Sequence, residues 1–97
     1  VLGDMLELGP ASPQLHWEVG ALAADLGVDE VIAVGTFAAE IVAGAGSGAQ
    51  PARVAEREDV AASLSLNPGD VVLIKGSRGV GLEIVAAELV ARDGETS

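Results

Sequence analysis

The residues best suited to chemistry lie in one short turn that follows an apolar run. The run covers residues 71–74, and the turn after it reads Lys75-Gly76-Ser77-Arg78-Gly79-Val80-Gly81. Lysine and arginine attract anions, and glycine lets a ligand come close to backbone N–H groups. The turn therefore predicts a binding site for a small anion, such as a carboxylate or a phosphate.

Two well-known phosphate-binding motifs do not describe this turn. A Walker A loop places its lysine after the glycines and before Ser or Thr, whereas Lys75 precedes the glycines. The dinucleotide fingerprint G-x-G-x-x-G also differs from the spacing Gly76-x-x-Gly79-x-Gly81. Spacing alone leaves a plain strand-to-helix turn equally possible, and the two cations favour a ligand.

The composition makes these cations unusual and narrows the class of partner. The 97 residues contain 5 Lys+Arg and 15 Asp+Glu, so the formal net charge is −10. Such a chain repels nucleic acid and anionic membranes over most of its surface, so we expect neither as a partner. With no Cys and a single His, we expect no metal site, and no apolar run reaches the roughly 18 residues of a membrane span.

Apolar runs alternate with segments of helical spacing along the chain. Continuous runs at residues 31–34 and 71–74 predict strands buried on both faces, and residues 52–55 are a weaker candidate. Residues 1–3 look like the end of a strand whose beginning precedes Val1, so we expect the chain to be a piece of a larger protein.

Helices are predicted between these strands. Ser12 as N-cap and Pro13 as first helical residue predict a helix that ends at Gly27. Its residues Leu15, Val19, Leu22 and Leu26 form an apolar stripe toward a sheet. The other predicted helices cover residues 38–45, capped by the Thr36 hydroxyl, residues 56–66, and residues 82–90 with an end near 92–94.

This alternation predicts an α/β, Rossmann-like three-layer fold with a mainly parallel sheet and helices on both faces, formed by residues 1–97 as a single domain. The carboxyl ends of parallel strands share one edge of a sheet, where α/β proteins bind ligands. Asp4, Gly35 and the turn at residues 75–81 should therefore lie on a common edge. By itself, Asp4 is better explained as a turn residue than as a ligand contact.

Three motifs also resemble a known family. They are Gly3-Asp4-Met5-Leu6-Glu7-Leu8-Gly9, Leu15-His16-x-x-Val19-Gly20 and Leu73-Ile74-Lys75-Gly76-Ser77-Arg78-Gly79-x-Gly81-Leu82-Glu83. Together they span most of the chain and are similar to the C-terminal domain of the Mur ligases, above all those that add D-alanyl-D-alanine. The resemblance implies an ATP-dependent amide ligase of peptidoglycan synthesis in the bacterial cytoplasm, acting on a UDP-N-acetylmuramoyl-tripeptide.

The resemblance also implies roles for individual residues. Asp4 is expected to bind ATP, at the ribose, when this domain closes over a central domain. Lys75, Gly76, Ser77 and Arg78 are expected to bind the incoming dipeptide or the reacting phosphate. The resemblance places the UDP substrate in an N-terminal domain, and the phosphate loop and the Mg²⁺ ligands in a central domain, both of which are expected to lie outside this chain. No catalytic residue is therefore expected here, the isolated chain is expected to be inactive, and His16 receives no role.

Other functions fit the same residues. A stand-alone module that binds a nucleotide or another phosphoanion would use the same edge without performing chemistry. Another Mur ligase would add a different amino acid on a related fold. A structural or interaction domain would need the glycines for turns alone.

Overall fold

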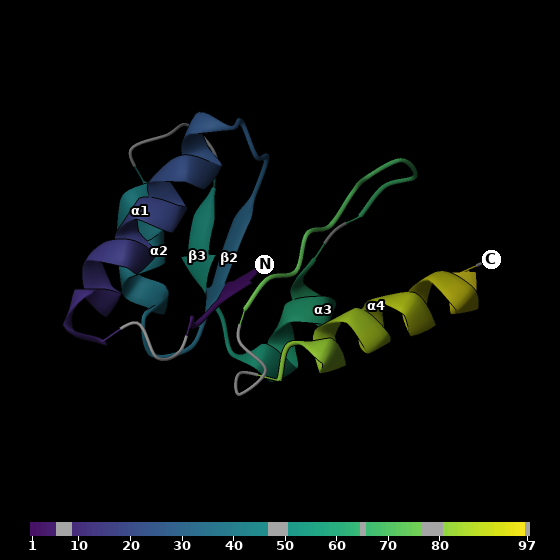
Figure 1. Ribbon diagram of the computed structural model, residues 1–97. Coiled ribbons are helices and arrows are strands. Elements are labelled where there is room, and N and C mark those ends of the chain that lie inside the picture. The colour runs from purple at the N-terminus through teal and green to yellow at the C-terminus, as the bar shows by residue number, and fades with distance from the viewer. Residues whose placement is uncertain (6–8, 47–50, 65, 77–80, 97) are drawn as a thin grey trace.

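The computed structural model describes residues 1–5, 9–46, 51–64, 66–76 and 81–96. Strands and helices alternate along the chain (Figure 1). In order, they are β1 (Leu2–Gly3), the 3₁₀ helix η1 (Gly9–Ala11), α1 (Ser12–Asp25), β2 (Val31–Val34), α2 (Ala38–Ala45), β3 (Ala52–Val54), the 3₁₀ helix η2 (Arg57–Asp59), α3 (Val60–Ser63) and α4 (Glu83–Thr96).

The strands form a parallel sheet in the order β1-β2-β3. Gly3 of β1 lies opposite Val34 of β2, so both strands end at the same level. The chain near Lys75 extends the sheet on the free edge of β1 through a parallel bridge to Leu2. There the Gly3 N–H donates to the Lys75 carbonyl at 2.8 Å, and the Lys75 N–H donates to the Val1 carbonyl at 3.0 Å.

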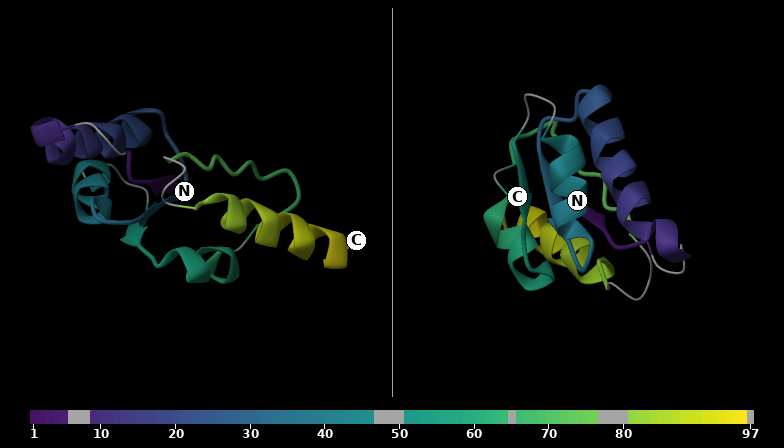
Figure 2. Two further views of the ribbon diagram at one scale, coloured as in Figure 1. Left: turned by 60° about the horizontal axis from the view of Figure 1, so that its bottom comes forward. Right: turned by 90° about the vertical axis from the view of Figure 1, so that its left-hand side faces the viewer.

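Two apolar cores cover the two faces of the sheet, and β2 contributes to both. Val31 and Ala33 pack with the α2 residues Ala38, Ile41 and Ala45, whereas Ile32 and Val34 pack with Val60, Leu82 and Val85. Figure 2 shows α1 and α2 on one side of the sheet and α3 and α4 on the other. The predicted three-layer α/β fold is thus confirmed, and residues 31–34 form a strand buried on both faces as expected.

The prediction of a strand buried on both faces at residues 71–74 is wrong. Val71 is 93% exposed and Leu73 is 68% exposed, while Val72 and Ile74 are half-buried. This alternation means that only one face of the segment packs against the protein. The segment is the outermost one next to β1, and in Figure 1 much of it runs apart from the sheet.

The predicted apolar stripe of α1 is wrong in its second half, because Leu22 and Leu26 are 55% and 72% exposed, while Leu15 and Val19 are half-buried. The buried residues of α1 are Ser12, His16 and Gly20. A Cβ atom on Gly20 would overlap the carbonyl oxygen of Ile41 in α2. A Cβ on Gly44 of α2 would likewise overlap the Trp17 carbonyl oxygen. Small residues therefore bring α1 and α2 into backbone contact, and this contact decides which face of α1 is buried.

Several helix ends differ from the sequence pattern. Gly27 follows α1 with a φ of +75°, which confirms the predicted stop. Ser12 is not a cap, because it is the first residue of α1 and its hydroxyl donates to the Gly9 carbonyl at 2.8 Å. The helix predicted over residues 56–66 is limited to η2 and α3, and α4 continues to Thr96, past the predicted end near residues 92–94.

Candidate functional site

Asp4 lies directly after β1 and is only 7% exposed. Its Oδ2 atom accepts the Thr36 N–H and its Oδ1 atom accepts the Phe37 N–H, both at 2.9 Å. These two N–H groups stand immediately before α2, where the partial positive charge of the helix end favours a carboxylate. Asp4 therefore caps the turn that leads into α2, and the predicted cap by the Thr36 hydroxyl is not formed.

Gly35 allows the Asp4 carboxylate to lie close to the backbone of the turn before α2. Its φ of +112° belongs to the region that L side chains rarely adopt, and a Cβ atom there would lie 2.6 Å from the Asp4 Cγ. The turn between β2 and α2 thus requires glycine for both its conformation and its space. A carboxylate has about four acceptor positions, and among the described residues two N–H groups bond to Asp4, one on each oxygen. Within the described part of the chain, Asp4 can therefore accept further hydrogen bonds.

Lys75 and Gly76 lie on the chain segment adjacent to β1. The Lys75 carbonyl accepts the N–H of Gly3, the residue before Asp4, and the Lys75 side chain is exposed. A Cβ atom on Gly76 would lie 3.2 Å from the Gly3 Cα and 3.0 Å from the Leu82 Cδ1. The structure thus places Asp4, Lys75 and Gly76 on the same edge of the sheet.

Ser77 and Arg78, the other two predicted members of the turn, lie outside the described residues. The described chain resumes at Gly81, which has a φ of +71°. A Cβ atom on Gly81 would overlap the Arg57 Nη1 atom, so this guanidinium lies against the glycine that closes the turn. The turn therefore has an arginine from η2 at its end.

Sequence reasoning missed Arg57 because its approach to Gly81 is a tertiary contact. The Nη2 atom of Arg57 also pairs with the Glu58 Oε1 at 3.1 Å. The pKa of Glu58 is lowered, first by a hydrogen bond from its own backbone and then by the Arg57 side chain. Among the signals in the sequence, only the scarcity of cations could have drawn attention to Arg57.

His16 lies beside the Asp4 cap and is fully buried. Its Nε2 atom accepts the Met5 N–H at 2.9 Å, and its Nδ1 atom lies 2.6 Å from the Ser12 carbonyl oxygen. Because a carbonyl only accepts, these partners assign the proton to Nδ1 and leave Nε2 as an acceptor on a neutral ring. The ring stacks on Phe37, with the centroids 4.4 Å apart and the planes at 27°.

A cavity of about 440 Å³ lies at the other end of the strands. Its lining includes Val1, Glu30 and Val31, which stand at or before the beginnings of β1 and β2. The cavity is therefore separate from the edge that carries Asp4 and Gly76. Across the described residues, no group of three or more His, Cys, Asp or Glu side chains is placed to hold a metal ion. In the same ranges, no helix is long and apolar enough to cross a membrane.

Comparison with known proteins places this chain in one family. The family model described as "Mur ligase, glutamate ligase domain" matches residues 1–78. Among curated proteins, the UDP-N-acetylmuramoyl-tripeptide–D-alanyl-D-alanine ligase of Bacillus subtilis (strain 168) is 37% identical over 95 residues, which cover 93% of this chain and 21% of that protein. The ligases of the same name from Mycobacterium tuberculosis (strain H37Rv) and Escherichia coli (strain K12) are 36% and 33% identical, covering 96% and 92% of the chain.

A solved structure is similar over the same range. The chain matches "Crystal structure II of MurF from Acinetobacter baumannii" with a TM-score of 0.74 and 30% identity, covering 92% of this chain and 21% of that one. The chain spans about a fifth of the length of the curated relatives that it matches.

Proposed function

The chain belongs to the Mur ligase family, and from this membership we propose that it serves as the C-terminal domain of an ATP-dependent ligase that joins D-alanyl-D-alanine to a UDP-N-acetylmuramoyl-tripeptide. The relatives that match most of the chain carry the name of this activity, which supports the choice of substrate within the family. We place the reaction in the bacterial cytoplasm, where UDP-linked precursors and ATP are found.

In the proposed reaction, a terminal carboxylate oxygen of the tripeptide first attacks the γ-phosphorus of ATP, so that an acyl phosphate forms, the bond from the γ-phosphorus to the bridging oxygen breaks and ADP leaves. The dipeptide amine then attacks the acyl carbon, so that a C–N bond forms, the C–O bond to phosphate breaks and inorganic phosphate leaves. The amine loses one proton in this step. The part played by this chain is binding and orientation, which holds the amine near the acyl carbon and excludes water.

We assign the anionic contact to Lys75 and Gly76, together with Ser77 and Arg78. The Lys75 side chain is exposed at the edge of the sheet, and Gly76, which has no side chain, lets the segment pass close to the backbone of Gly3. A lysine at this position can hold the carboxylate of the dipeptide or the phosphate that leaves, and cations near developing charge stabilise a transition state.

We assign the nucleotide contact to Asp4. Its carboxylate is held on the same edge and retains acceptor positions that suit the hydroxyl groups of a ribose. The observation that carries the proposal is the adjacency of Asp4 and Gly76 on neighbouring segments, since it lets one domain closure act on both substrates. We assign Mg²⁺ to the central domain of the full-length ligase, as the family resemblance implies.

The test is ligation kinetics in the full-length protein. Lys75→Met keeps the length of the side chain and removes its charge, whereas Lys75→Arg keeps the charge. We expect Lys75→Met to lower kcat/KM for the dipeptide by about tenfold or more, consistent with the loss of a hydrogen bond to a charged group. Its melting temperature should match that of the wild type, because Lys75 is exposed. Wild-type kinetics in Lys75→Met would remove Lys75 from the site.

Two outcomes would favour the alternatives. Ligation of a single amino acid in place of D-alanyl-D-alanine would indicate another Mur ligase activity. Tight binding of ATP to the 97-residue chain alone, measured by isothermal titration calorimetry, would favour a stand-alone nucleotide module. A domain that supplies only part of a shared site should bind ATP weakly by itself.

A further inference from the structure

We propose that His16 is a positioning residue for the nucleotide, acting through Asp4. The proposal rests on the function proposed above, because the ligand of Asp4 is taken to be ATP. It gives a role to a histidine that is fully buried within α1 and has hydrogen-bond partners at both ring nitrogens.

The contacts of His16 form a closed circuit with Asp4. The Nε2 atom of His16 accepts the N–H of Met5, the residue that follows Asp4 in the chain. The His16 ring stacks on Phe37, whose own N–H donates to the Asp4 Oδ1. The circuit thus runs from Asp4 to Met5, to His16, to Phe37 and back to Asp4.

This circuit holds Asp4 on both sides. On its amino side, Gly3 is hydrogen-bonded to Lys75 and lies in register with Val34. On its carboxyl side, the described anchor is the bond from the Met5 N–H to His16. With the backbone fixed at both sides and the carboxylate fixed by two N–H groups, the remaining acceptor positions of Asp4 point in set directions. Such preorganisation lowers the entropy lost when a ligand binds.

Filling space does not account for this histidine. An apolar side chain could fill the same volume without the cost of burying two ring nitrogens. The bond of Nδ1 to the Ser12 carbonyl holds the ring tautomer that leaves Nε2 as an acceptor, and that acceptor faces the residue next to Asp4. The polar atoms of the ring are thus arranged to hold the Met5 N–H.

Two substitutions separate the two ring bonds. The Oε1 atom of Gln can occupy the position of Nε2 and accept the Met5 N–H, so His16→Gln retains the proposed contact. The Nδ2 atom of Asn can replace Nδ1 as a donor to the Ser12 carbonyl, but Asn is too short to reach Met5. We therefore expect His16→Asn to raise KM for ATP about tenfold in the full-length ligase, as expected for one lost hydrogen bond, with kcat and the KM for the dipeptide within about twofold of wild type. His16→Gln should restore the KM for ATP to within about threefold of wild type.

A double-mutant cycle tests the route through Asp4. In an Asp4→Asn background, His16→Asn should cause no further rise in the KM for ATP, because the residue that it positions has already been changed. Equal KM values for the Asn and Gln variants of His16, or full additivity with Asp4→Asn, would overturn the proposal and leave His16 as a packing residue. A fall in kcat accompanied by changes in the KM values for both ATP and the dipeptide would also overturn the proposal.

Failure of the proposed ligase function can be distinguished from failure of the positioning role of His16. A wild-type protein that carries out no ligation would refute that function irrespective of the variants. The same comparison would then be made with the dissociation constant for ATP, measured by calorimetry. A weaker ATP affinity in His16→Asn that is restored in His16→Gln would still support the positioning role, and equal affinities would refute it.

Discussion

Replacing Asp4 with Ala should destabilise the fold as well as the site, and the structure sets the size of the effect. Two backbone N–H groups lose the carboxylate that accepts them at 2.9 Å. Thr36 is exposed, so water can replace its lost bond, whereas Phe37 is half-buried and its N–H is harder to hydrate. A buried donor that loses its acceptor costs about 1–3 kcal/mol. Because only the Phe37 N–H is partly shielded from water, we expect about 2 kcal/mol for Asp4→Ala, the middle of that range.

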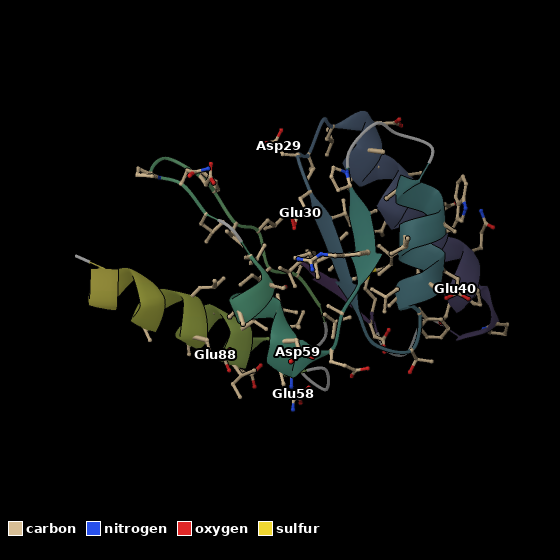
Figure 3. All side chains as sticks on the ribbon, turned by 180° about the vertical axis from the view of Figure 1, so that it is seen from behind. Asp29, Glu30, Glu40, Glu58, Asp59 and Glu88 are labelled. Atoms are coloured by element: carbon tan, nitrogen blue, oxygen red, sulfur yellow. The ribbon has the colours of Figure 1, made fainter. Side chains whose placement is uncertain are left out.

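The assay is urea unfolding followed by far-ultraviolet circular dichroism, with the midpoint and slope compared at fixed protein concentration. Asp29→Ala is the control, because Figure 3 shows Asp29 on the turn before β2, where it is exposed. This control should change the free energy of unfolding by no more than about 0.5 kcal/mol. If Asp4→Ala behaved like Asp29→Ala, the capping role of Asp4 would be refuted.

Two further predictions concern glycines, each with a matched control. Gly20→Ala should lower the free energy of unfolding by about 1–3 kcal/mol, because the added methyl group overlaps the backbone of α2 and forces α1 outward. Gly27→Ala should cost less, about 1 kcal/mol, since its φ of +75° is strained but its surroundings are open; equal losses in urea unfolding would exclude the close helix contact. Gly35→Ala should both destabilise the protein and raise the KM for ATP, because its methyl group would displace the Asp4 carboxylate. Gly69→Ala, with a φ of +93° in open space, should leave that KM unchanged, and a similar rise in both variants would contradict the model of the site.

The features that the sequence predicts correctly are those that depend on neighbouring residues. The apolar run at residues 31–34 implies burial on both faces, and β2 lies between two cores as that pattern requires. Alternation of strands and helices then implies a parallel sheet, whose geometry brings Asp4 and Gly76 to the same edge. The location that we propose for the site follows from these local patterns.

The features that were missed depend on contacts between distant segments. The leucines of α1 have helical spacing, but the contact of Gly20 and Gly44 with opposing backbones turns a different face of α1 inward. The run at residues 71–74 is as apolar as β2, yet its outer position leaves alternate side chains exposed. Periodicity shows which side chains can be buried, but not whether a second layer is present to bury them.

The sequence left Asp4 with two interpretations, a turn residue or a ligand contact, and the structure shows why these need not compete. The carboxylate caps the turn that leads into α2 with one hydrogen bond on each oxygen, and this cap holds it at the edge where a ligand would bind. A flexible aspartate would have to be ordered on binding, at a cost in entropy. A capping aspartate is ordered already by folding. The same reasoning extends to His16, whose bond to the Met5 N–H orders the backbone next to Asp4 before any nucleotide arrives. Structural and functional roles at this edge thus depend on one set of hydrogen bonds, so variants that weaken the fold here should also weaken binding of ATP.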